Sequence, residues 1–230
     1  MVMKLKQMTL IGLFGSVAAL SQAEERPPIC FFTNGDIDGY VGHDVRLVEK
    51  SNVERVKDGV KFNGKNSLVK FAIPWMYPNQ VLSVTFVADI RIDAIPAKDG
   101  FVVLRPGFDN KLNIRGDGKV TFSIWNYTSQ KEAVVESRTR IEAGGKYRLA
   151  GVVDCSRDNK TRLSLYIDGR KEGDGELDGP PRPYSQELCL GGVSRDNTIQ
   201  CPLACVIYNF WYFYKPLTAE EINALPGKQE

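Results

Sequence analysis

Alternation of apolar and polar residues is the strongest pattern in the chain. From residue 82 to residue 92 every second position is apolar, namely Leu82, Val84, Phe86, Ala88, Ile90 and Ile92. Residues 119–125 and 161–169 repeat this period of two. Because side chains point to opposite faces along a strand, the pattern predicts strands with one buried face.

Dipeptides that favour tight turns lie between these runs and several shorter apolar runs. They are Asn63-Gly64, Asp99-Gly100, Asp117-Gly118, Gly144-Gly145 and Asp168-Gly169. About a dozen short strands separated by turns are typical of an all-β fold. We therefore expect a two-sheet antiparallel jelly-roll sandwich.

One short helix is expected at the C-terminal end. Thr218 and Glu221 have the spacing of a capping box, and Pro226-Gly227 would end the helix. Residues 170–186 combine charged residues, glycines and prolines, so we expect an exposed loop there.

The first 23 residues resemble a secretory signal peptide. Lys4 and Lys6 precede an apolar stretch of 13 residues, and small residues precede Glu24. A membrane anchor is the alternative, but a spanning helix needs about 20 apolar residues. We expect residues 1–23 to be removed, leaving residues 24–230 as a single secreted, extracellular domain with no membrane span.

The charge balance argues against nucleic acid as a partner. Two of the 30 basic residues and none of the 28 acidic residues lie in the first 23 positions. The remaining 207 residues therefore carry 28 basic and 28 acidic residues, a net charge of zero. A neutral chain without a basic cluster does not fit binding to phosphate backbones.

A secreted chain is expected to carry disulfides and glycans. The five cysteines, Cys30, Cys155, Cys189, Cys201 and Cys205, allow two disulfides and leave one thiol over, with fifteen possible arrangements. Asn126 and Asn159 begin glycosylation sequons.

The order of elements in the second half resembles a laminin-G-like domain of the concanavalin A-like lectin and glucanase superfamily. The matching stretches are "YRLAGVVD", "LSLYIDGR", "LCLGG" and "VIYNFWYFYKPLTAEEINAL", and the matching residues are Tyr166, Asp168, Gly169, Gly191, Gly192, Tyr214, Leu217, Glu221 and Ile222. The resemblance covers roughly residues 28–225 and implies a jelly roll. It says little about function, since the shared residues are turn glycines and apolar positions.

A calcium site and a simple turn are both consistent with the stretch "NGDIDGYVGHD". Asn34, Asp36 and Asp38 have the spacing of a calcium-binding loop, with Gly39 at its sixth position. Its twelfth position is Val45, which offers no carboxylate, so calcium would need further ligands. The resemblance favours a solvated turn after the first strand.

Catalytic residues are not evident. Glycoside hydrolases of the superfamily resemble one another in an E-x-D-x-x-E strand pattern, which this sequence lacks. The nearest carboxylates, in residues 172–178, fall in the expected loop, and His43 has no partnered nucleophile. We therefore name no catalytic residue.

Binding is the expected function. Trp75 and Tyr77 lie between prolines in a loop, where they could stack on a sugar or pack beneath the loop. The sequence thus predicts a non-enzymatic module for an extracellular glycan or glycoprotein. A structural matrix protein, including a biomineral-associated one, and an unrecognised polysaccharide hydrolase or lyase are the alternatives.

Overall fold

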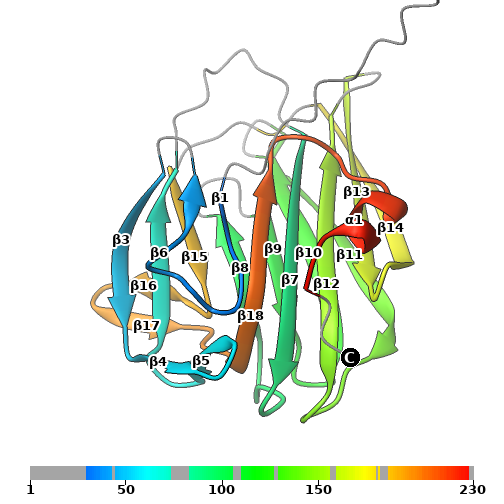
Figure 1. Ribbon diagram of the computed structural model, residues 1–230. Coiled ribbons are helices and arrows are strands. Elements are labelled where there is room, and N and C mark those ends of the chain that lie inside the picture. Colours follow the sequence, from blue (N-terminus) through cyan, green and yellow to red (C-terminus); the bar gives the residue numbers. More distant parts are fainter. Residues whose placement is uncertain are drawn as a thin grey trace, which may run out of the picture.

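Two antiparallel β-sheets packed face to face, with one short helix near the C-terminus, make up the fold (Figure 1). The computed structural model describes residues 30–42, 45–73, 83–105, 110–126, 129–155, 159–179, 181 and 186–227. The predicted jelly-roll sandwich and the C-terminal helix are therefore confirmed. None of the described helices is long and apolar enough to cross a membrane.

The first sheet has nine strands. Seven run in the order β14-β13-β12-β7-β18-β1-β2, and β5 pairs with both β18 and β4. The strands are β1 (Cys30–Phe32), β2 (Val41–Gly42), β4 (Val53–Val56), β5 (Gly59–Asn63), β7 (Val84–Ile92), β12 (Lys146–Asp154), β13 (Lys160–Ile167), β14 (Arg170–Asp178) and β18 (Ala204–Phe213).

The second sheet has seven strands in the order β11-β10-β9-β8-β15-β6-β3. They are β3 (Arg46–Ser51), β6 (Leu68–Ala72), β8 (Gly100–Arg105), β9 (Asn110–Ile114), β10 (Lys119–Asn126), β11 (Lys131–Arg140) and β15 (Glu187–Leu190). A separate hairpin of β16 (Val193–Arg195) and β17 (Thr198–Gln200) follows, with Asp196 and Asn197 left-handed at its turn.

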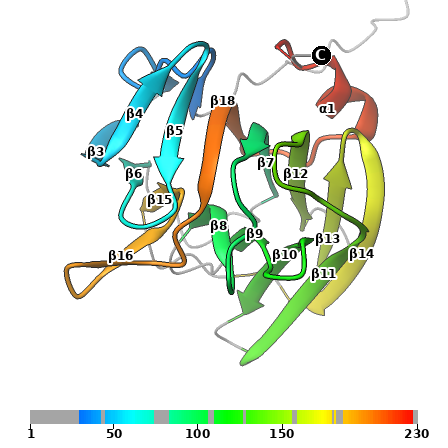
Figure 2. The ribbon, with the colours of Figure 1, turned by 90° about the horizontal axis from the view of Figure 1, so that it is seen from below.

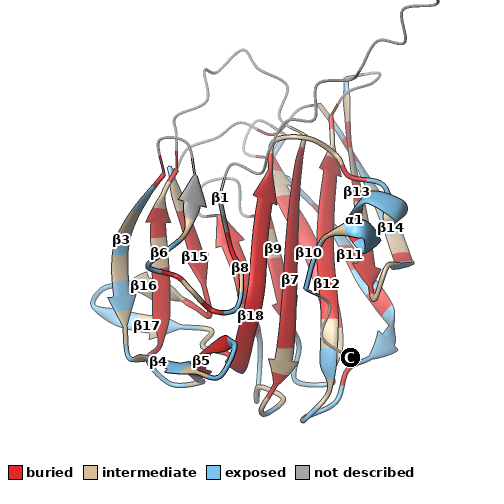
Figure 3. Cartoon of the chain, in the orientation of Figure 1, coloured by how far each residue is buried: buried red, intermediate tan, exposed pale blue. Residues whose placement is uncertain are grey.

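The residues at the predicted alternate positions form the core between the two sheets. Of the positions expected to share one face of β7, Phe86, Ala88 and Ile90 are all buried in the main cluster between the sheets. The inward residues of β10 and β13 join the same cluster. Figure 3 shows that burial is concentrated on the central strands and falls off toward the edges.

The expectation of a loop over residues 170–186 was wrong for its first half, which forms strand β14. β14 pairs with β13 and lies beside β11 at the edge of the sandwich (Figure 2). A Cβ on Gly173 would lie 2.9 Å from Val135 Cγ1, and a Cβ on Gly175 would lie 3.0 Å from Val135 Cγ2. These glycines let β14 approach β11 closely, because a side chain there would collide.

Glu172 fixes the same edge from inside. It is buried, and its Oε2 accepts hydrogen bonds from the backbone N–H groups of Arg138 (2.9 Å) and Thr139 (2.8 Å). The Thr139 hydroxyl donates to the other carboxylate oxygen. A charged residue in a strand is therefore explained by three bonds that join the two sheets.

The helix α1 (Ala219–Ala224) begins with the predicted capping box. The N–H of Thr218 donates to Glu221 Oε2 at 2.8 Å, and the N–H of Glu221 donates to Thr218 Oγ1 at 3.2 Å. Two otherwise unpaired helix donors are thereby satisfied, which fixes where the helix starts.

A buried arginine holds the end of α1 on the outer face of the first sheet. Arg148 pairs with both carboxylate oxygens of Asp89, at 2.6 and 2.8 Å. Its remaining N–H groups donate to backbone carbonyls in the last turn of the helix and just after it, including Ile222 at 3.0 Å and Leu225 at 2.9 Å. This network positions the segment that borders the candidate site.

Candidate functional site

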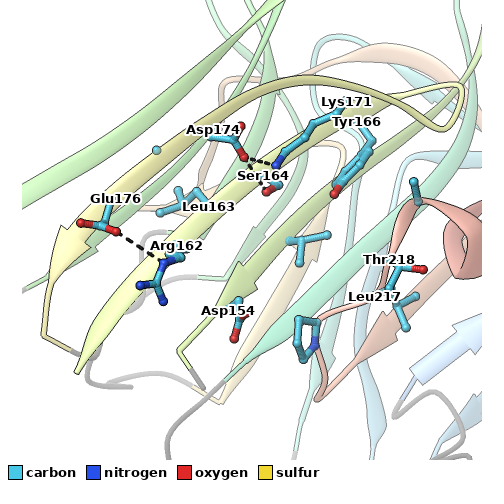
Figure 4. Close-up of a pocket in the computed structure, with 14 residues that line it drawn as sticks. Asp154, Arg162, Leu163, Ser164, Tyr166, Lys171, Asp174, Glu176, Leu217 and Thr218 are labelled. Atoms are coloured by element: carbon cyan, nitrogen blue, oxygen red, sulfur yellow. Dashed lines mark hydrogen bonds and ion pairs between the residues drawn. The ribbon is translucent and has the colours of Figure 1, made fainter. Parts of the chain in front are cut away.

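A groove of about 790 Å³ lies on the outer face of the first sheet (Figure 4). It runs over β12, β13 and β14, and the segment from Pro216 to Ala219 forms one wall. Thr85 positions that wall, because its hydroxyl donates to Lys215 O (2.8 Å) and accepts from the N–H of Leu217 (3.0 Å).

The floor of the groove is largely apolar. Val152, Tyr166 and Leu217 belong to one buried cluster that also packs beneath α1. The Tyr166 side chain is nearly buried, at 9% exposure, yet its hydroxyl has no hydrogen-bond partner among the described residues. Figure 4 shows this hydroxyl directed into the open space of the groove. A ligand in the groove can therefore contact the apolar floor and hydrogen-bond to the Tyr166 hydroxyl.

The opposite wall carries carboxylates on β14. Asp174 accepts a hydrogen bond from the Ser164 hydroxyl at 3.0 Å and pairs with Lys171. Glu176 pairs with Lys160 and, at 3.4 Å, with Arg162.

The hydrogen bond to Glu176 raises the pKa of Lys160. Exposed ion pairs of this kind add little stability. They do leave carboxylate oxygens exposed along the groove, where a ligand can donate to them.

This wall corrects part of the argument against catalysis. Asp174 and Glu176 lie at alternate positions of a strand, not in a loop. Both carboxylates pair with cations.

The proposed calcium ligands lie in a turn docked against the first sheet. Asn34 is left-handed, and its N–H donates to Asn209 Oδ1 at 2.9 Å. Asp36 pairs with Arg55 at 3.3 Å, and Asp38 pairs with Lys50 at 2.7 Å. No group of three or more acidic, histidine or cysteine side chains suited to a metal occurs among the described residues. The calcium site and the simple turn therefore both stay open as predictions.

Trp75, Tyr77 and His43 lie outside the described residues, as does the expected signal peptide. The structure therefore does not test the roles predicted for them. Among the residues that form the groove, the sequence interpretation weighed only the carboxylates of residues 172–178 for a function, and it rejected them as catalytic. Tyr166 and Leu217 served only as matches to a family pattern.

The cysteines carry free thiols wherever the structure describes their side chains, at Cys155, Cys189, Cys201 and Cys205. The side chain of Cys30 lies outside the description. Burial raises the pKa of Cys155 to about 11 and that of Cys189 to about 12. The two predicted disulfides have no support from this part of the chain and stay a prediction.

The two sequon asparagines have different surroundings. Asn126 is 2% exposed, and its Nδ2 donates to Asp178 O at 3.3 Å. Its Oδ1 accepts from the N–H of Ser129 at 3.2 Å. Asn159 is exposed, in a left-handed turn between β12 and β13.

The arrangement of two curved antiparallel sheets is that of lectin-like binding domains. A family model, Laminin_G_3, described as the concanavalin A-like lectin/glucanases superfamily, matches residues 63–223. The match covers more than half of the chain, so the chain belongs to this family. No curated protein sequence matches it.

Solved structures with this fold include two toxin-related binding domains. The binding domain of botulinum neurotoxin serotype D has a TM-score of 0.65 at 14% identity, covering 86% of this chain and 50% of that one. The binding domain of Paraclostridial mosquitocidal protein 1 has a TM-score of 0.63 at 13% identity, covering 86% and 51%. This chain therefore spans about half the length of each.

A third structure is matched along nearly its whole length. It is the CBM40 domain of the Ruminococcus gnavus IT-sialidase, bound to α2,3-sialyllactose. Its TM-score is 0.54 at 15% identity, covering 74% of this chain and 97% of that one. At these identities the likeness concerns the fold.

Proposed function

We propose that the chain is a secreted module that binds a glycan in the groove over β13 and β14 without chemically altering it. The observation that carries the proposal is the pairing of an apolar floor with exposed carboxylate oxygens along one wall. A sugar ring presents C–H groups on its faces and hydroxyls on its edges, so it can contact both. Pockets that bind small molecules commonly combine an apolar lining with a few placed polar groups.

Two further points support a glycan. The chain belongs to a family of lectins and glucanases. A CBM40 domain of similar fold is bound to a sialylated sugar in its solved structure.

Secretion is proposed from the first 23 residues, through their basic start, apolar stretch and small residues before Glu24. N-terminal sequencing of protein recovered from culture medium should begin near Glu24. Mature protein that still begins MVMKLK would contradict this part of the proposal.

A glycan array compared between two serine variants tests the binding site. Ser164→Ala removes a hydroxyl that borders the groove and donates to Asp174. Ser194→Ala makes the same change on β16, outside the groove. We expect the first variant to lose signal and the second to bind like the unmodified protein. Equal binding by all three proteins would place the ligand elsewhere.

The same glycans, incubated with the protein and assayed for new reducing ends, test the absence of turnover. We expect binding with no new ends. Release of shorter sugars would show that the module is an enzyme and would revive the hydrolase interpretation.

A further inference from the structure

A second recess continues the groove beyond β14. It has a volume of about 410 Å³ and lies between the start of β11 and the end of β14, where Lys131, Glu132, Leu177 and Asp178 line it. Glu176 lines both recesses. The two recesses are therefore adjacent, and a ligand that fills the first can extend over β14 into the second.

The carboxylates of β14 form a row along this path. Asp174, Glu176 and Asp178 occupy alternate, exposed positions of the strand. A rise of about 3.3 Å per residue places successive members about 7 Å apart and makes the row about 13 Å long. One pyranose ring cannot reach all three, whereas a chain of sugars can.

Tyr166 offers a polar contact on the apolar floor. The residue is 9% exposed, and its hydroxyl points into the open space of the groove (Figure 4). A phenol oxygen can both donate and accept a hydrogen bond, so it is available to a ligand hydroxyl there.

The charges at the two recesses do not favour an anionic ligand. Five of the lining residues are acidic, namely Glu132, Asp154, Asp174, Glu176 and Asp178, against three basic ones, Lys131, Arg162 and Lys171. Arg162 and Lys171 already pair with carboxylates of β14. Lys160 and Lys111 pair with Glu176 and Glu132, so the cations only match the carboxylates in number. A sialic acid, uronate or sulfate would therefore find no surplus of positive charge. An ion-paired carboxylate still has free lone pairs for sugar hydroxyls.

We infer that the ligand is an uncharged oligosaccharide of at least three units, bound along β14 with one end over Tyr166 and the other beside Asp178. This inference rests on the proposed function, because it specifies the ligand of the same groove. The similar fold of the CBM40 domain, which binds the anionic sugar sialyllactose, would instead suggest a charged ligand.

Calorimetric titration with uncharged hexose oligomers of two, three and five units tests the length. Each linkage type that binds should be compared across these lengths. We expect the five-unit chain to bind at least about tenfold more tightly than the two-unit chain, since tenfold corresponds to about 1.4 kcal/mol of added contact. Because the ligand is uncharged, its affinity should change little with salt.

Variants at the two ends separate the recesses. Asp178→Asn should weaken the five-unit chain about fivefold, through loss of a charged acceptor, and leave the two-unit chain unchanged. Tyr166→Phe should weaken chains of every length. Asp196→Asn, at the exposed tip of the β16–β17 hairpin, is the matched control and should change neither.

Three results would overturn the inference. Equal affinity for two and five units, with no effect of Asp178→Asn, would show a short ligand and would leave the proposed function standing. Tighter binding of sialylated or sulfated chains than of uncharged chains of equal length would refute the charge argument. Failure of every glycan to bind folded protein would reject the inference and the proposed function together.

Discussion

The two glycosylation sequons differ in how accessible their asparagines are. Asn126 and Asn159 both begin sequons, but the glycan-accepting Nδ2 of Asn126 is buried and bonded to Asp178 O. Asn159 is exposed. A glycan on Asn126 would break that bond and would have to be accommodated inside the fold.

We therefore predict that Asn159 alone carries a glycan when the chain passes through a eukaryotic secretory route. Asn159→Gln should remove the glycan mass seen by intact-protein mass spectrometry. Asn126→Gln should leave that mass unchanged. A loss of mass in the Asn126 variant would contradict the buried geometry.

The turn that holds Asp36 and Asp38 gives a second residue-scale prediction. Both carboxylates have a cation beside them, Arg55 and Lys50 respectively. Calcium would have to displace these partners, so we expect millimolar calcium to leave the melting temperature unchanged.

Binding to the folded state alone would instead raise stability by about 2.7 kcal/mol at a hundredfold excess over Kd. A calcium-dependent rise that is lost in Asp36→Asn/Asp38→Asn would establish the metal site.

Whole elements depend on a few buried polar contacts. The α1 segment is fastened to the first sheet by Arg148, which pairs with Asp89 beneath it. We predict that Arg148→Met costs about 3–5 kcal/mol, because it leaves the buried Asp89 carboxylate without its cation. The melting temperature should fall by about 6–20 °C, at about 2–4 °C per kcal/mol.

Two comparisons make this prediction specific. Arg55→Met breaks an exposed ion pair with Asp36 and should cost less than about 1 kcal/mol. Adding Asp89→Leu to Arg148→Met removes the unpaired charge and should recover part of the loss. Equal stability of the Arg148 and Arg55 variants would show that the buried network does not hold the segment.

The elements differ in how readily the sequence predicts them. β7 was predictable because one face must be apolar to enter the core, and the helix because Thr218 and Glu221 form its cap. β14 was not, since glycine and charge normally disfavour strands. Its glycines allow β14 to pack closely against Val135. This contact forms only when the two sheets come together, so local sequence does not reveal it.

The groove depends on the whole molecule and was not predictable from local patterns. Its floor comes from β12 and β13, one wall from β14 and the other from the segment before α1. These parts lie far apart in sequence and meet through the strand order of the first sheet and the Arg148 network. The aromatic pair that the sequence favoured, Trp75 and Tyr77, is outside the described residues.

Buried thiols should make the whole fold sensitive to alkaline pH. Burial raises the pKa of Cys155 to about 11 and that of Cys189 to about 12, above the ordinary value near 9. A group with a raised folded-state pKa contributes stability that is complete below its unfolded pKa and is lost as pH rises toward the folded pKa. The contribution should therefore fall from about pH 9 to about pH 11 for Cys155 and to about pH 12 for Cys189.

Urea unfolding at about pH 7 and about pH 10 measures this loss. Burial also raises the pKa of Tyr212, so the comparison needs Cys155→Ala and Cys189→Ala, in which the decline should be smaller. Thiol counting in denaturant would show whether these cysteines are free or bridged. An unchanged decline in both variants would contradict the thiol account.

The most direct test of glycan binding in the groove is a backbone-amide NMR titration with an uncharged five-unit oligosaccharide. Saturable shifts confined to residues 131–132, 152–154, 162–178 and 216–219 are the predicted result, with the β16–β17 hairpin unaffected. Shifts confined to any other surface, or no shifts at saturating sugar, would contradict it.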